Sequence, residues 1–295
     1  MKRISVTAIR KITILFVICM IPALYLTIAN AVIEPQAHIS PQYPKTDILP
    51  ILAKSRLSDA DYRTLLFQTG LGRPAIDELR VQNPDSAQFI QRLQDYFFKD
   101  VKFICENNSP VSKEESLVDE HGNLISGTEF ASLHSGDILV TKSSHTLGWR
   151  NGHSALVIDP VRGLTLESVV LGTNSTVQDI RKWINYPNFM LLRLKESTAY
   201  SPELIARSAA ERLNDIPYDL TVGIFSSKDA NEPAANTLEK IAGTHCSHLV
   251  WQAFKNYGVD IDTNGGILVT PRDIAKSTRL EIVQVYGVDP ANIWP

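Results

Sequence analysis

Cysteine is scarce in this chain, which has three thiols in 295 residues, at Cys19, Cys105 and Cys246. So few cysteines cannot build the dense disulfide framework of a small secreted module. The chain also lacks repeats of fixed period and long low-complexity tracts, which argues against a solenoid or a disordered protein. Its 44% hydrophobic and 21% charged residues are typical of an ordinary globular protein.

The first 31 residues do not have the pattern of a folded segment. They contain four basic residues and no acidic one, then a nearly unbroken apolar run over residues 12–28, then Ala-Asn-Ala at residues 29–31. This pattern predicts a secretory signal peptide cleaved after Ala31, so we expect a secreted or cell-envelope protein that meets the membrane only transiently through this segment. An uncleaved anchor is the alternative, because the run approaches the roughly 20 residues of a spanning helix.

Basic residues are in short supply beyond this leader. Residues 32–295 contain 25 basic and 32 acidic residues, a net charge of −7, without a dense lysine or arginine stripe. Such a surface disfavours binding to the phosphate backbone of DNA or RNA. We therefore expect no nucleic-acid partner.

The N-terminal part of the mature chain is predicted to be a tether followed by helices. Residues 32–57 are rich in proline, which predicts an extended tether. Residues 58–107 have helical periodicity, and Ser58 with Asp61 resembles a capping box at its start. Residues 108–132 are polar and irregular, so we assign 58–132 to one helical accessory segment.

Residues 133–295 are predicted to form a second, larger unit of mixed structure. Short apolar runs bounded by turn residues predict strands, and capping signals such as Thr270 with Asp273 predict helices. The separation of strands from helices predicts an α+β domain. The expected strands cover residues 137–141, 153–159, 164–168, 189–194 and 282–286, and the expected helices cover 201–213 and 246–257.

Three residues of this unit suggest nucleophilic chemistry. Cys246 opens an expected helix, where free backbone N–H groups and the helix dipole favour the thiolate. His153 begins an expected strand and has the properties of a general base. Glu167 lies on the next strand, where a carboxylate would fix the histidine tautomer. Each has an ordinary alternative: a buried structural cysteine, a strand-end histidine and a solvated glutamate.

Four short motifs resemble those of NlpC-type papain-like hydrolases. Residues 246–251 (CSHLVW) are similar to that family's Cys-Ser-Gly-Leu-Val motif, and residues 216–218 (IPY) to its Pro-Tyr. Residues 135–139 (SGDIL) and 152–158 (GHSALVI) are similar to its Gly-Asp strand and its histidine strand. Because the histidine precedes the cysteine here, the order resembles the circularly permuted branch, the YiiX-like amidases.

This resemblance implies a permuted papain-like catalytic domain with an antiparallel sheet and packed helices, over residues 133–295. It implies Cys246 as nucleophile, His153 as base and Glu167 as the third polar residue. Tyr218 is expected to line the site and to help hold the substrate or oxyanion. Trp149 and Arg150 precede the histidine strand, so we expect them at the pocket rim, although an ordinary amphipathic loop is equally consistent.

The expected activity is that of an exported cysteine hydrolase or amidase that needs no cofactor. The expected substrate is a peptide of the cell wall, with an acyl lipid as the alternative substrate of the same Cys–His pair. A zinc site of His245, Cys246, His248 and His153 is disfavoured, because adjacent helix residues point in different directions. We therefore expect no metal. A third possibility is a non-enzymatic cell-surface module with a Cys105–Cys246 disulfide.

Overall fold

A computed structural model describes residues 16–18, 20, 21, 24 and 37–294, apart from 83–84, 147–148, 196–198, 227 and 229–241. The expected signal peptide therefore lies almost wholly outside the described residues. Within the described part, no helix is both long and apolar enough to cross a membrane.

The centre of the molecule is an antiparallel sheet of six strands, in the order β7-β6-β5-β3-β8-β9. Its middle strands are almost continuously apolar, which is the pattern of strands buried on both faces. The α+β class with an antiparallel sheet is confirmed. The strands are β3 (Ile138–Thr141), β5 (His153–Asp159), β6 (Leu164–Glu167), β7 (Thr176–Asp179), β8 (Phe189–Leu194) and β9 (Leu280–Tyr286).

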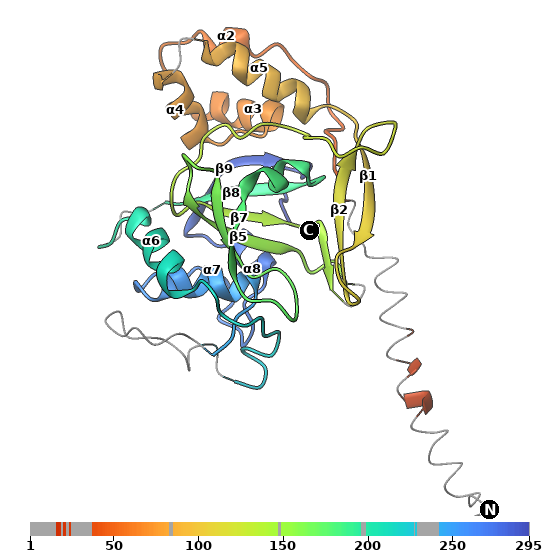
Figure 1. The fold of residues 1–295 in the computed structure, drawn as a ribbon. Coiled ribbons are helices and arrows are strands. Elements are labelled where there is room, and N and C mark those ends of the chain that lie inside the picture. Colours follow the sequence, from red (N-terminus) through yellow and green to blue (C-terminus); the bar gives the residue numbers. More distant parts are fainter. Residues whose placement is uncertain are drawn as a thin grey trace, which may run out of the picture.

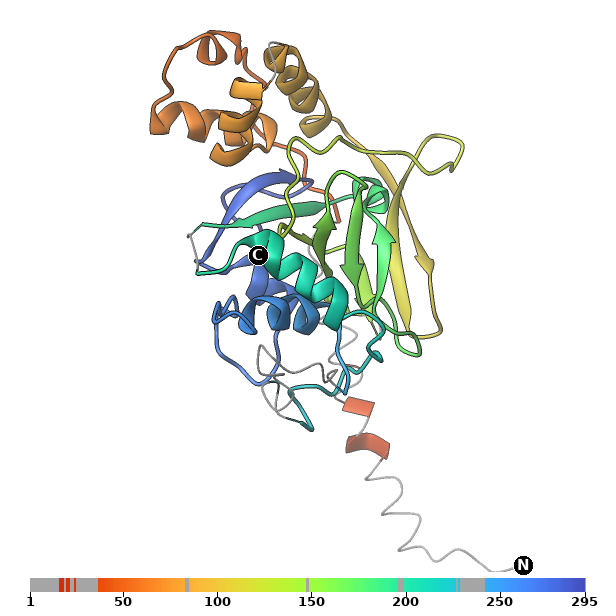
Figure 2. The same ribbon diagram turned by 60° about the vertical axis from the view of Figure 1, so that its left-hand side comes forward.

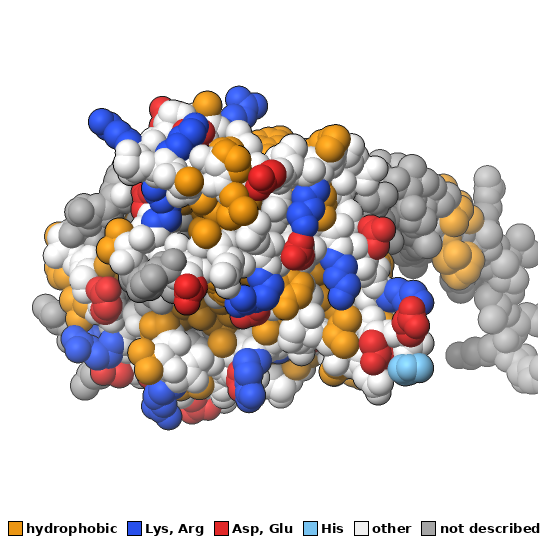
Figure 3. Space-filling model, turned by 90° about the horizontal axis from the view of Figure 1, so that it is seen from above, with side chains coloured by type: hydrophobic (Ala, Val, Ile, Leu, Met, Phe, Trp, Pro, Cys, Tyr) orange, Lys and Arg blue, Asp and Glu red, His pale blue; other side chains and the backbone are white. Residues whose placement is uncertain are grey.

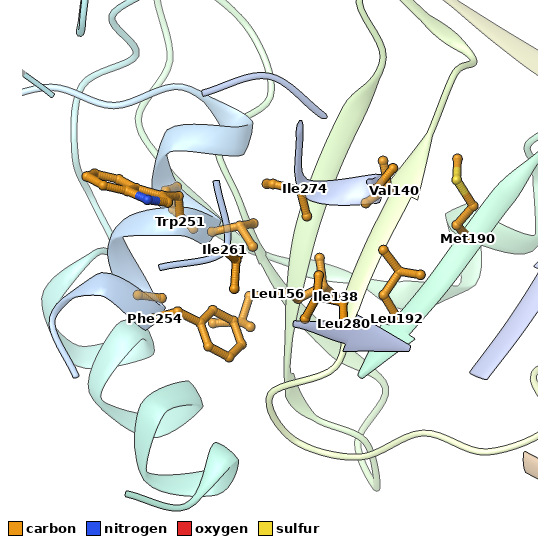
Figure 4. Packing of buried hydrophobic residues seen from close by; sticks show 14 of the residues in the cluster. Ile138, Val140, Leu156, Met190, Leu192, Trp251, Phe254, Ile261, Ile274 and Leu280 are labelled. Carbon is orange, nitrogen blue, oxygen red and sulfur yellow. The ribbon is translucent and has the colours of Figure 1, made fainter. Parts of the chain in front are cut away.

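Helices cover both faces of this sheet (Figures 1 and 2). On one face lie α6 (Pro202–Arg212), α7 (Cys246–Lys255) and α8 (Pro271–Ala275), which pack against sheet residues such as Ile138 and Leu156. Figure 4 shows residues of this core, which include Trp251 and Phe254 of α7 and Ile138 and Leu156 of the sheet.

The other face is covered by the N-terminal helices α2 (Leu49–Leu52), α3 (Asp59–Thr69), α4 (Arg73–Gln82) and α5 (Ser86–Phe97). They share a second core with sheet residues such as Leu139 and Val157. The outer surface seen from this side carries charged side chains of both signs among apolar ones (Figure 3).

The link between α3 and α4 is held directly against β9. Gly70 adopts a φ of +73°, and a Cβ at this position would lie 2.1 Å from the carbonyl oxygen of Val285. The backbone N–H of Val285 donates to the carbonyl of Gly70, and that of Gly72 donates to Val283. Glycine is required here because it allows both the left-handed conformation and the close backbone approach.

Two predictions for the N-terminal part are wrong. The expected extended tether of residues 32–57 is packed on the fold over its described part, 37–57, since Ile48 is fully buried and the backbone N–H of Ile39 donates to the carbonyl of Gly287. The accessory segment is helical only to Phe97: β1 (Lys102–Asn107) and β2 (Ser112–Val118) form a hairpin instead. With β4 (Ser144–Thr146), this hairpin makes a separate sheet in the order β1-β2-β4.

Candidate active site

The structure brings Cys246, His153 and Glu167 together in the interior. Their exposed fractions are 6%, 3% and 0%. His153 begins β5, Glu167 ends β6, and Val157 of β5 pairs with Thr165 of β6. Because side chains alternate along a strand, residues an even number of positions from this pair share one face. His153 and Glu167 therefore meet, with 2.6 Å between His153 Nε2 and Glu167 Oε2.

Glu167 is held by four groups that favour its charged form. The Thr165 hydroxyl and the Trp183 indole N–H donate to Oε1 at 2.6 and 3.0 Å, and Lys182 Nζ lies 2.6 Å from Oε2. Lys182 and Trp183 come from the 3₁₀ helix η1 (Ile180–Asn185). Burial raises the pKa of Glu167, but Lys182 and His153 lower it by more than burial raises it, to about 2. The carboxylate is therefore ionised at neutral pH.

His153 is held in the protonated state by its neighbours. Burial lowers its pKa, but hydrogen bonds to Cys246 and Glu167 and the charges of both raise it more, to about 9. The ring also stacks on Trp183, with 5.6 Å between ring centres and 18° between planes. An imidazolium is stabilised over an aromatic face in the same way as other cations.

Cys246 is the first residue of α7 and has a thiol pKa that lies well below its usual range. Burial raises this pKa, but the hydrogen bond from His153, the charge of that ring and the nearby His245 ring lower it more. The N-terminus of α7 adds a favourable dipole for the anion. Cys246 and His153 thus form a thiolate–imidazolium pair.

Two cavities meet at the thiol. The larger, about 300 Å³, has mainly apolar walls, and none of the described residues that line it is acidic. A smaller one lies between His153 and the sheet formed by β1, β2 and β4. The larger cavity is lined by Arg150, Asn151, Tyr218, Leu220, His245, Cys246, Ser247, Leu268, Val269, Thr270, Pro271, Arg272 and Trp294.

Of the three residues predicted to line the pocket or its rim, Tyr218 and Arg150 line a cavity and Trp149 does not. Tyr218 lines both cavities, and burial together with the nearby charge of Cys246 raises the pKa of its hydroxyl. Arg150 lines the larger cavity, but its guanidinium is bound to both carboxylate oxygens of Glu115 at 2.6 and 2.7 Å. Trp149 is half exposed and lines neither of these two cavities, so its expected place at the rim is wrong.

Of the site residues that were not predicted from the sequence, five contact the triad or line both cavities. Thr165 carries a detectable signal, since it precedes Glu167 by two residues on one strand face. Lys182 and Trp183 lie in a segment without a motif, and only the tertiary fold brings them to Glu167. The other two are Asn151, which lines both cavities, and His245, which precedes the nucleophile.

Cys105 and Cys246 are not joined by a disulfide. Cys105 of β1 pairs across the strand with Glu115, and its sulfur, a Glu115 oxygen and a His145 nitrogen lie within 4.8 Å of one another. These residue types can bind a metal, but Arg150 occupies both oxygens of Glu115 and its positive charge opposes a cation there. Because Cys105 and Cys246 are both free thiols, the Cys105–Cys246 disulfide expected for a binding module is absent.

Comparison of the chain with protein-family models, curated proteins and solved structures gives no match. The chemical assignment therefore rests on the geometry of the site. A buried thiolate contacts an imidazolium, which in turn contacts a fixed carboxylate. These three groups are the components that nucleophilic acyl transfer requires.

Proposed function

We propose that this protein is an exported cysteine hydrolase with a permuted papain-like core, which cleaves amide bonds in peptides of the cell wall. The observation that carries the proposal is the contact series Cys246–His153–Glu167, in which the pKa of the thiol is lowered and that of the imidazole is raised. The order of β5, β6 and α7 along the chain supports the permuted core.

In the proposed reaction the Cys246 thiolate attacks the substrate carbonyl carbon, and the carbonyl π electrons move to oxygen. The tetrahedral intermediate collapses with cleavage of the C–N bond, and His153 gives its proton to the departing amine. Water then attacks the thioester, His153 takes a proton from it, and the acid leaves with the thiolate restored. Glu167 keeps the imidazole oriented and its charge compensated throughout.

Two side chains at the thiol support a peptide substrate. Asn151 Oδ1 is buried and has no hydrogen-bond partner among the described residues, so it suits a peptide N–H. Arg272 lines the larger cavity, is exposed, and forms no ion pair within the described part of the chain, so it suits a substrate carboxylate.

The apolar walls favour a second candidate, the hydrolysis or transfer of a lipid acyl group by the same Cys–His pair. Leu220, Leu268, Val269 and Trp294 line the same cavity as Cys246. Such a wall stabilises an alkyl chain by burial, whereas Arg272 would then meet a lipid phosphate.

The deciding experiment is mass spectrometry of purified cell-wall peptides and of acyl lipids after incubation with the mature protein. We expect new amine and carboxyl termini in the peptides, no change with Cys246→Ala, and a several-fold higher KM with Arg272→Gln for peptides that keep a free carboxylate. Cysteine-dependent release of fatty acid without peptide cleavage would establish the second candidate instead. No Cys246-dependent product from either class would refute both.

A further inference from the structure

His245 precedes the nucleophile and closes the N-terminus of its helix. It is the N-cap of α7, where its Nδ1 accepts the backbone N–H of His248 at 3.4 Å. The side chain is only 5% exposed. Its other ring nitrogen, Nε2, is buried and has no hydrogen-bond partner among the described residues.

The capping contact decides which nitrogen carries the proton. A backbone N–H can only donate, so Nδ1 presents its lone pair to His248; the Ser247 hydroxyl also lies 3.3 Å from this nitrogen and donates to the carbonyl of Val269 at 2.9 Å. The neutral ring then carries its proton on Nε2, which makes this atom a donor without an acceptor. Buried donors are almost always satisfied, so an unsatisfied one beside a cavity indicates that a ligand oxygen completes it.

The cavity at this donor is the one that contains the thiol. His245 and Cys246 line it together, and the His245 ring is close enough to the sulfur to lower the pKa of the thiol. A carbonyl attacked by Cys246 therefore develops its negative oxygen within this cavity. His245 cannot serve as the base in this tautomer, because one nitrogen caps the helix and the other already carries a proton.

We propose that His245 is a further catalytic residue, whose Nε2–H donates to the oxyanion that forms when Cys246 attacks a carbonyl. This inference rests on the proposed thiol-hydrolase function. When the C–S bond forms, the carbonyl π pair moves to oxygen, and the His245 N–H stabilises that charge without transferring its proton. The oxyanion then re-forms the carbonyl as the leaving group departs.

The test compares two reactions of the same thiol. Iodoacetamide alkylates a thiolate without forming an oxyanion, whereas p-nitrophenyl acetate acylates it through a tetrahedral oxyanion and releases p-nitrophenolate. Both rates are measured at pH 8 on the mature protein, with intact mass used to assign the label to Cys246. The variant is His245→Asn, because asparagine is a preferred N-cap and preserves the end of α7 while removing the ring N–H.

We expect His245→Asn to lower the acylation rate by about 10²-fold, the effect of losing one oxyanion donor. Alkylation should change by less than about threefold, because His153 still holds the thiolate. His245→Ser, which also caps a helix, should behave in the same way and serves as a second variant if the first folds poorly.

Equal losses in both reactions would overturn the inference, since His245 would then act only on the thiolate. Unchanged rates in both would also overturn it, leaving a purely structural cap. A wild-type protein that is alkylated but not acylated at Cys246 would refute the oxyanion site alone. Neither reaction at Cys246 in the wild type would refute the proposed function itself.

Discussion

At the scale of single residues, the charge state of the Cys246 sulfur depends on a carboxylate that reaches it only through the His153 ring. Glu167 contacts His153 and not Cys246, yet its charge is one cause of the raised pKa of His153. The raised pKa in turn keeps the proton on the ring beside the thiolate. Glu167 is therefore a positioning residue, and its effect is measurable as a titration.

Glu167→Gln should move the titration of His153 to lower pH. The wild-type ring should titrate at about 9, and removal of the adjacent negative charge should lower this pKa by roughly 1–3 units. Since a raised pKa stabilises the folded state below the unfolded value of 6.5 and loses that contribution as pH rises through 9, the variant should lose stability mainly at and below neutral pH. NMR titration of the His153 ring proton, with urea unfolding at pH 6 and 9, measures both effects.

Glu203→Gln is the matched control for this change, because Glu203 is an exposed carboxylate on α6. It should leave the His153 titration where it is in the wild type. A wild-type His153 that titrates near 6.5, or a Glu167→Gln variant with an unmoved titration, would contradict the role given to the carboxylate.

At the scale of elements, the sequence predicted those units whose signals are local. The capping boxes of Ser58 with Asp61 and of Thr270 with Asp273 are both present, since a cap involves residues only three apart. The motif around Cys246 likewise predicted the start of α7.

The hairpin of β1 and β2 could not be predicted in this way. Its strands are mostly polar and much of β1 is exposed, so they lack the apolar alternation that marks a strand. What holds β2 is distant in sequence: β4 pairs with it, and Arg150 binds its buried Glu115. The roles of Lys182 and Trp183 could not be predicted for the same reason, because these residues contact Glu167 only when η1 packs beside it in the folded chain.

The Glu115–Arg150 pair should be the main attachment of this hairpin to the site. The two side chains are 3% and 6% exposed, and His145 also contacts Glu115 at 3.1 Å. Glu115→Gln leaves the buried guanidinium without its counter-charge and should lower the free energy of unfolding by about 3–5 kcal/mol. The control is Glu106→Gln on the exposed strand β1, expected within about 0.5 kcal/mol of wild type by urea unfolding. Equal effects of the two changes would contradict the attachment.

At the scale of the whole molecule, the two hydrophobic cores are back to back on one sheet. Ile138 and Val140 of β3 belong to the core beneath α6 and α7, whereas Leu139 between them belongs to the core beneath α3–α5. The sequence predicted the N-terminal helices as an accessory segment because their periodicity is self-contained. It could not predict that they cover the second face of the same strands, because hydrophobic periodicity does not specify the partner of an apolar face.

A shared sheet has a consequence for unfolding, because neither core can be lost without exposing strands that the other core needs. We therefore expect one cooperative transition in calorimetry, with equal calorimetric and van't Hoff enthalpies. Ile76→Ala on α4 and Ile205→Ala on α6 form a matched pair, since both isoleucines are fully buried and each belongs to a different core. Each should destabilise the protein by about 2–5 kcal/mol and lower the midpoint of that same transition.

Two transitions, with each variant shifting only one of them, would mean that the N-terminal helices and the rest unfold as independent units. A single transition lowered by both variants would tie the rigidity of β5 and β6, and hence the distance between His153 and Glu167, to helices on the far side of the sheet.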